Sequence, residues 1–273
     1  MAYYRPETQL RQSALQPGAT ALLFIDVQRY NCSKDGAIYQ GLSEEERQAS
    51  GPSSGAMAPG LEHGSAAGTV PPWYQRTLCT LPPSLQSEGV CHFFQRVEEC
   101  GPLWARLQRA CRAAGMEVMY TVIQSLTADG RDRGLDYKLS GFHVPPGSPD
   151  AQMLDCIAPG PDEMVLPKTS SSVFQSTALD YVLRSLGVRQ LVLAGCVTDQ
   201  CVEHAVRDAC DLGYLVTLVS DACATYSRQR HEASLAAVAG YCRQRTTAEL
   251  EAEVAEVAAA SGSGQGTGGQ QPA

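Results

Sequence analysis

The 273-residue chain lacks the features that would point to a membrane, a nucleic acid or secretion. No apolar run approaches the ~20 residues that a membrane-spanning helix requires, so no membrane partner is expected. There is no basic stripe, and a net charge of −8 argues against a nucleic-acid or anionic-lipid surface. The first residues, Met-Ala-Tyr-Tyr-Arg-Pro-Glu-Thr, contain no apolar secretory core, so we expect a cytoplasmic protein.

The chain also lacks cysteine spacing typical of zinc sites, although it contains 11 cysteines. No CxxC pair and no cysteine–histidine ligand spacing occurs, so a structural zinc site is not expected. The odd count, without a secretory signal, favours a reducing compartment over a disulfide framework. Most of these cysteines lie in apolar or helical patterns, where cysteine behaves as a small buried hydrophobe: Cys111, Cys156, Cys196, Cys210, Cys223 and Cys242.

Strand-length apolar runs alternate with segments of helical spacing along most of the chain, which predicts an α/β fold. We expect a three-layer α/β/α sandwich around a central, mostly parallel, doubly wound (Rossmann-like) sheet. The expected strands are 20–26, 117–123, 163–168, 190–197 and 214–221, and the expected helices are 103–115, 177–187 and 231–243.

The predicted domain organisation is simple. Residues 1–245 form a single domain, followed by a C-terminal helix over 246–260 and a disordered Gly-rich tail over 261–273. Residues 43–83 are rich in Gly, Ser, Ala and Pro without periodicity, and we interpret them as a flexible surface insertion between the first strand and the first helix.

The stretch from Gly195 to Cys201 carries the strongest chemical signal, because it places a cysteine where a buried strand gives way to a helix. Thr198 or Asp199 is a natural N-cap, which puts Cys201 in the first helical turn. There the helix dipole favours a thiolate over a thiol. Taken alone, Cys201 is either a nucleophile or a buried filler of the core.

Asp26 and Lys168 each close a predicted strand. Taken alone, Asp26 is interpreted as a carboxylate that caps a turn, and Lys168 as a solvated lysine at the end of a strand. Together with Cys201 they bring an acid, an amine and a thiol to one edge of a parallel sheet, where open α/β folds bind ligands. A carboxylate can accept the thiol proton, and an ammonium lowers the thiol pKa.

The segments that carry these residues resemble the three signatures of the isochorismatase-like cysteine hydrolases. They are Phe-Ile-Asp26-Val-Gln, Pro-Lys168-Thr-(x)3-Val-Phe174, and Gly195-Cys-Val-Thr-Asp-Gln-Cys201-Val. The resemblance spans about residues 19–245 apart from 43–83. It implies a catalytic triad of Asp26, Lys168 and Cys201, a cis peptide between Cys196 and Val197, and an oxyanion hole formed by the Val197 and Cys201 amides.

The resemblance also limits the chemistry. The family includes nicotinamidases, N-carbamoylsarcosine amidases, ureidoacrylate amidohydrolases and biuret hydrolases. The segment after the second strand has no histidine until His143, so the metal site of metal-dependent nicotinamidases is not expected, nor any other cofactor. The cysteine points to hydrolysis of a non-peptide C–N bond in a small linear amide, ureide or carbamoyl compound. The family commonly forms dimers and tetramers, so a homodimer or homotetramer is expected.

Six residues are candidates for substrate binding. A fork from Arg131 or Arg133 would bind a substrate carboxylate or a urea-type carbonyl, and the alternative is that both are solvated loop residues. Gln28 and Gln124 could orient the substrate or donate to its carbonyl. Tyr137 and Phe174 are expected to contact the substrate, with Phe142 as a further wall of the pocket, unless these rings pack only against the core.

Two rival functions use the same residues. One is a catalytically silent binding module, which would have little reason to retain a buried ion cluster. The other is a redox pair formed by Cys196 and Cys201, which needs facing Cβ atoms that the strand geometry does not favour.

Overall fold

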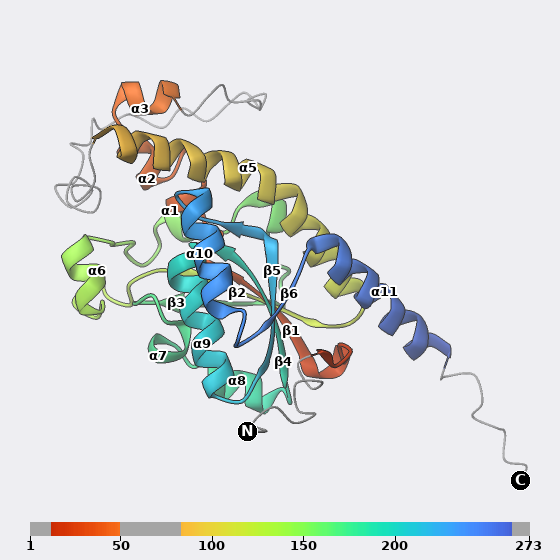
Figure 1. The fold of residues 1–273 in the computed structure, drawn as a ribbon. Coiled ribbons are helices and arrows are strands. Elements are labelled where there is room, and N and C mark those ends of the chain that lie inside the picture. Colours follow the sequence, from red (N-terminus) through yellow and green to blue (C-terminus); the bar gives the residue numbers. More distant parts are fainter. Residues whose placement is uncertain (1–11, 50–82, 264–273) are drawn as a thin grey trace, which may run out of the picture.

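A computed structural model describes residues 12–49 and 83–263. Six parallel strands form one sheet in the order β3-β2-β1-β4-β5-β6 (Figure 1). The order reverses between β1 and β4, which is the switch point of a doubly wound sheet. The strands are β1 (Thr20–Ile25), β2 (Glu117–Ile123), β3 (Met164–Lys168), β4 (Gln190–Cys196), β5 (Leu215–Ala224) and β6 (Arg243–Arg245). The predicted α/β/α fold is confirmed.

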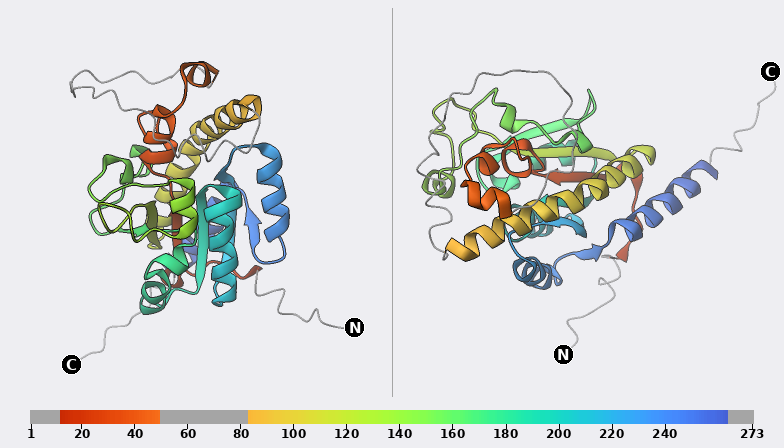
Figure 2. Two further views of the ribbon diagram at one scale, coloured as in Figure 1. Left: turned by 90° about the vertical axis from the view of Figure 1, so that its left-hand side faces the viewer. Right: turned by 90° about the horizontal axis from the view of Figure 1, so that it is seen from above.

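Helices cover both faces of the sheet. One face packs against α1 (Arg29–Cys32), α2 (Ala37–Gln40), α5 (Pro83–Ala113) and α11 (Thr247–Ser263). The other packs against α7 (Val173–Ser176), α8 (Leu179–Ser185), α9 (Glu203–Asp211) and α10 (Arg228–Val238). The long helices α5 and α11 lie side by side (Figures 1 and 2). The connections contain α3 (Glu44–Ala49), α6 (Leu135–Ser140), the short 3-10 turns η2 (Pro17–Ala19), η3 (Pro149–Ala151) and η4 (Asp155–Ile157), and the π-helical turn η5 (Thr198–Val202).

Alternation along the central strands divides the core between these two layers. In β1, Leu22 and Phe24 belong to the cluster under α5, whereas Leu23 and Ile25 belong to the cluster under α9. Every residue of β1 and β4 is buried. Such double burial explains why these strands are continuous apolar runs in the sequence.

Most strand predictions agree with the structure to within a few residues, but two helices and one strand differ. Helix α5 begins at Pro83 instead of residue 103. It continues through Pro102, and because a proline usually interrupts a helix, the helical spacing upstream of Pro102 was not recognised in the sequence. The helix expected over 231–243 is α10, which begins at Arg228 because Ser227 Oγ accepts a hydrogen bond from Arg230 N. Helix α10 ends at Val238, and Arg243, the last residue of the expected helix, begins the edge strand β6, which is too short to be recognised by periodicity.

Residues 177–180, Thr-Ala-Leu-Asp, have the residue types and spacing of a capping box, but the reciprocal hydrogen bond of that motif is not formed. Thr177 Oγ1 accepts a hydrogen bond from Leu179 N at 3.1 Å, but Asp180 does not return one to the Thr177 amide. Its carboxylate is instead bound by Arg184 and Tyr214. A partner one turn along α8 and a tertiary partner therefore take the place of the local cap.

The predicted insertion and tail fall largely outside the described residues. Of residues 43–83, the structure describes 43–49, which contain α3, and Pro83, where α5 begins. The predicted tail starts too early, because residues 261–263 still belong to α11. In the described part of the chain, no helix combines the length and hydrophobicity needed to cross a bilayer.

Candidate active site

Three strand ends place the predicted acid, amine and thiol at one edge of the sheet. Asp26 follows β1, Lys168 ends β3, and Cys201 lies in η5, shortly after β4. Strand β3 is separated from β1 by β2, a distance of about 10 Å at the usual strand spacing. The four-carbon stem of lysine spans this gap, which a shorter cation would not.

Lys168 is the centre of this cluster. Its ammonium lies 2.8 Å from Asp26 Oδ2 and donates to Cys201 Sγ at 3.3 Å. It also donates to Tyr137 OH at 2.8 Å and to the Ser170 carbonyl at 3.0 Å. Burial by itself would lower the pKa of Lys168, but Asp26, Cys201 and Tyr137 together raise it well above its ordinary value. The lysine therefore stays charged although it has no exposed surface.

Backbone geometry and one hydroxyl group orient the carboxylate. Asp26 adopts φ = 54°, in the left-handed region where aspartate is among the better-tolerated residues. Its Oδ1 accepts a hydrogen bond from Thr121 Oγ1 at 2.7 Å, and Thr121 Oγ1 accepts one from Asp26 N at 3.2 Å. Oδ2 is thereby left to Lys168.

The turn that carries Cys201 differs from the prediction. Thr198–Val202 is a π-helical turn, in which Val202 N donates to Val197 O, and α9 begins only at Glu203. Neither Thr198 nor Asp199 caps a helix. Thr198 Oγ1 instead bonds to His231 Nδ1 at 3.1 Å, and the Asp199 carboxylate binds Thr225 and Arg230. Contacts with α10 and with the residue after β5 have replaced the local cap.

The resting charge of Cys201 also differs from the prediction. Burial, followed by the nearby Asp26 carboxylate, raises the pKa of the Cys201 thiol to about 11, against the lowering effect of Lys168. At neutral pH the sulfur is therefore a thiol. The adjacent carboxylate is the group placed to remove its proton.

A small cavity opens onto the sulfur. It encloses about 400 Å³, open mouth included, and its lining contains Asp26 and Cys201. Cys196 and Val197, which are joined by a cis peptide bond as the resemblance implied, also line it. The remaining lining residues are Tyr30, Asn31, Ile38, Ile123, Tyr137, Phe142, Ser171, Gln200 and Tyr226.

Of the six predicted substrate-binding residues, the structure brings only Tyr137 to this cavity. Gln28 is fully buried, and its amide is engaged by the backbone of Ile123 and Asp150. Phe174 lies in the core under α9, tilted against Tyr214. Gln124 does not line the cavity, and its backbone amide donates to Lys168 O.

The structure does not bring the two arginines of the predicted fork to the cavity either. The Arg131 side chain is 74% exposed and pairs with Asp129 in its own loop. Arg133 donates to the carbonyls of Gly130 and Phe142, at 2.9 and 2.7 Å. Both arginines therefore stabilise the loop after β2, and neither lines the cavity.

Sequence reasoning missed the residues that α1 contributes. Tyr30 and Asn31 follow Asp26 closely, so the turn into α1 directs them toward the same cavity. Their closeness to the predicted carboxylate was the only available signal. Tyr226, which follows β5, carried no signal in the sequence.

The cysteine expected to belong to a rival redox pair has another neighbour. Cys196 Sγ lies 3.3 Å from Cys32 Sγ, and both thiols are buried. Cys201 Sγ instead lies 3.3 Å from the Lys168 ammonium and 3.9 Å from the Tyr137 hydroxyl group. Among the described residues, no three His, Cys, Asp or Glu side chains form a cluster that could hold a metal ion.

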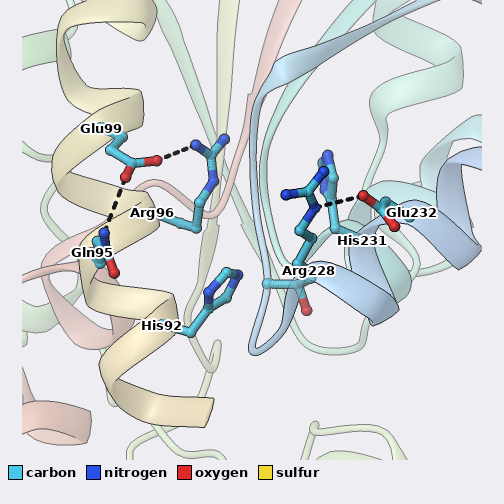
Figure 3. A pocket seen from close by; sticks show the side chains of 8 residues that line it. His92, Gln95, Arg96, Glu99, Arg228, His231 and Glu232 are labelled. Atoms are coloured by element: carbon cyan, nitrogen blue, oxygen red, sulfur yellow. Dashed lines mark hydrogen bonds and ion pairs between the residues drawn. The ribbon is translucent and has the colours of Figure 1, made fainter. Parts of the chain in front are cut away.

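A second and larger cleft lies between α5 and α10 (Figure 3). It encloses about 860 Å³, open mouth included, but its carboxylates are already paired within their own helices, Glu99 with Arg96 and Glu232 with Arg228. Its lining holds no cysteine, serine or lysine that could act as a nucleophile. The cleft that contains Cys201 is therefore the candidate active site.

Comparisons with known proteins agree with this fold. The isochorismatase domain family model matches residues 98–249. A cysteine hydrolase from Pseudomonas syringae has a similar structure, with a TM-score of 0.61 and 23% identity over 90% of this chain and 96% of that one. An isochorismatase family protein from Desulfovibrio vulgaris has a TM-score of 0.59 and 22% identity over 87% of this chain and 98% of that one. The N-carbamoylsarcosine amidase from Thermoplasma acidophilum has a TM-score of 0.53 and 19% identity over 84% of this chain and 96% of that one.

Proposed function

This chain belongs to the isochorismatase family, and on that premise we propose that it is a cysteine-dependent hydrolase of small amides, ureides or carbamoyl compounds. The observation that carries the proposal is the contact of the Lys168 ammonium with both Asp26, at 2.8 Å, and Cys201, at 3.3 Å. A base, a cation and a sulfur nucleophile thus meet beside one cavity.

The first half-reaction transfers the acyl group to sulfur. Asp26 takes the proton of the Cys201 thiol as sulfur bonds to the substrate carbonyl carbon, and the carbonyl π electrons move to oxygen. The Val197 and Cys201 amides are assigned to that developing oxyanion. The C–N bond then breaks as the carbonyl re-forms, and Asp26 returns the proton to the leaving nitrogen. The products are ammonia or an amine and a thioester, or a thiocarbamate from a ureide.

The second half-reaction restores the enzyme. Asp26 accepts a proton from water as the water oxygen adds to the thioester carbonyl. Collapse of this adduct breaks the C–S bond and releases the acid, and sulfur recovers its proton from Asp26. Lys168 keeps its charge throughout and offsets the negative charge that moves between Asp26, sulfur and the oxyanion.

The test is ammonia release from a panel of acetamide, propionamide, benzamide, phenylurea and biuret by the purified protein. We expect turnover of at least one compound, and a loss on the order of 10³-fold or more in Cys201→Ala, as for other nucleophile deletions. The matched control is Cys210→Ala, which removes a half-buried thiol outside the cavity and should retain activity.

Mass spectrometry with a slowly hydrolysed amide gives an independent measurement. An acyl adduct on the peptide that contains Cys201 supports the mechanism. Cys201-independent ammonia release, or no turnover of the whole panel, contradicts the proposal and favours a catalytically silent binding module.

A further inference from the structure

Asn31 is a polar residue of the cavity that the proposed mechanism does not use. It lies on α1, is only 7% exposed and lines the same cavity as Cys201. Its side-chain oxygen Oδ1 is buried and accepts no hydrogen bond from the described residues. A buried acceptor without a partner is unfavourable, so a bound molecule that donated to it would gain affinity.

The other end of the amide fixes which atom is available. Asn31 Nδ2 donates to Cys196 Sγ at 3.3 Å. The single hydrogen of the Cys196 thiol has two acceptors within reach, Asp26 O at 3.2 Å and Cys32 Sγ at 3.3 Å. When it is donated to either of them, the Cys196 sulfur is an acceptor toward Asn31. Reversing the amide would set an oxygen acceptor against a sulfur acceptor. The contact therefore holds Nδ2 at Cys196 and leaves Oδ1 for a ligand.

The charge of the lining limits what that ligand can be. Asp26 is the one charged residue among those that line the cavity, and Lys168 lies behind it as its partner. Arg131 and Arg133 are both committed to their own loop. A substrate carboxylate would thus meet an acid and no cation, whereas an N–H group would meet an acceptor.

The remaining wall is largely apolar. The rings of Tyr30, Phe142 and Tyr226 line it together with Ile38 and Ile123. Such a wall suits a compact, uncharged group attached to the carbonyl.

We propose that Asn31 Oδ1 accepts an N–H hydrogen bond from the nitrogen attached to the scissile carbonyl of the substrate. Asn31 is thus a specificity-determining residue that selects uncharged primary amides and ureides over the corresponding esters. This inference rests on the proposed function, because it concerns the substrate of the same site.

The experiment compares the best primary amide of the panel with the methyl ester of the same acid, which has no N–H to donate. Asn31→Leu keeps the number and branching of the side-chain heavy atoms but has no acceptor, and Asn31→Asp keeps an oxygen acceptor. We expect Asn31→Leu to lower kcat/KM for the amide by about 10- to 100-fold relative to the ester. Asn31→Asp should recover much of the preference for the amide.

The matched control is Ser125→Ala. Its hydroxyl group is also buried without a hydrogen-bond partner in the described part of the chain, but it does not line the cavity. It should leave the amide-to-ester ratio unchanged. Thermal unfolding of each variant separates a loss of fold from a loss of selectivity.

The outcomes separate the two proposals. An equal effect of Asn31→Leu on amide and ester, with Cys201-dependent turnover in the wild type, would overturn the role of Asn31 alone. A wild-type preference for amides that carry a carboxylate would also overturn it. The absence of any Cys201-dependent turnover would overturn both proposals.

Discussion

Three influences act on the pKa of the Cys201 thiol, and they do not all act in the same direction. Burial and the carboxylate of Asp26 raise its pKa to about 11, and the ammonium of Lys168 lowers it. The first two prevail, because both disfavour a negative charge on a sulfur that solvent hardly reaches. The sequence predicted the neighbours of this residue correctly but not its resting charge, since the degree of burial depends on the whole fold.

The pH dependence of alkylation follows from that raised pKa. The thiol form dominates below pH 11, and the thiolate fraction falls about tenfold for each pH unit below it. We expect the rate of Cys201 labelling by iodoacetamide to rise steadily from pH 7 toward pH 11. Peptide mass spectrometry of briefly exposed samples measures this rate without interference from the other cysteines.

A short cysteine peptide blocked at both ends, whose thiol has an ordinary pKa of about 8.5, is labelled in parallel as the reference and should level off earlier. Labelling of Cys201 that is fast and already constant near neutral pH would show a resting thiolate. That result would support the thiolate that the sequence predicted for Cys201.

At the scale of elements, the approach of β1 to β4 depends on one glycine. Gly195 adopts φ = 127°, and a Cβ atom there would lie 2.2 Å from the Ile25 carbonyl oxygen. These two strands carry Asp26 and the turn with Cys201 at their ends. The glycine therefore allows the close strand pairing that sets the separation of base and nucleophile.

Gly195→Ala tests this dependence. A positive φ alone disfavours alanine by about 1–3 kcal/mol, and the backbone clash adds to that. We expect urea unfolding to show a larger loss of stability than in Gly213→Ala, where φ is 92° but no atom lies within 4 Å of the new Cβ. Equal losses in the two variants would mean that β1 can move away from position 195 at little cost.

On the scale of the whole molecule, α11 completes one layer of the sandwich. Leu250 and Val254 are buried in the core cluster under α5, and Arg106 forms an ion pair with Glu251 between the two helices. Asp221, in β5, accepts a hydrogen bond from Thr247 N at 2.7 Å. These contacts tie the C-terminal helix to β5 and α5.

Leu250→Ala should therefore destabilise the whole domain. Leu250 has no exposed surface, and a buried leucine replaced by alanine loses about 2–5 kcal/mol. Leu212→Ala, at a side chain that is 38% exposed, serves as the control and should lose less than about 1 kcal/mol. If Leu250→Ala unfolded in two separate transitions, or lost no stability, α11 would be an independent appendage.

The sequence by itself determined the parallel sheet and the three residues at its carboxyl edge. A strand buried on both faces is apolar along its whole length, and the residue that ends it is fixed by its position in the chain. Strands β1, β2 and β4, and with them Asp26 and Cys201, were therefore predictable from local pattern and motif.

Only the tertiary structure decided the π-helical turn, the neutral thiol and the lining of the cavity. Each of these depends on partners distant in sequence: His231 and Arg230 hold the turn, and Tyr226 and Phe142 close the pocket. The side chains of Arg131 and Arg133 do not line the cavity, because a carboxylate and carbonyl groups of their own loop bind them. Tertiary packing determines whether a side chain bonds to a local or a distant partner, and packing cannot be derived from a single sequence.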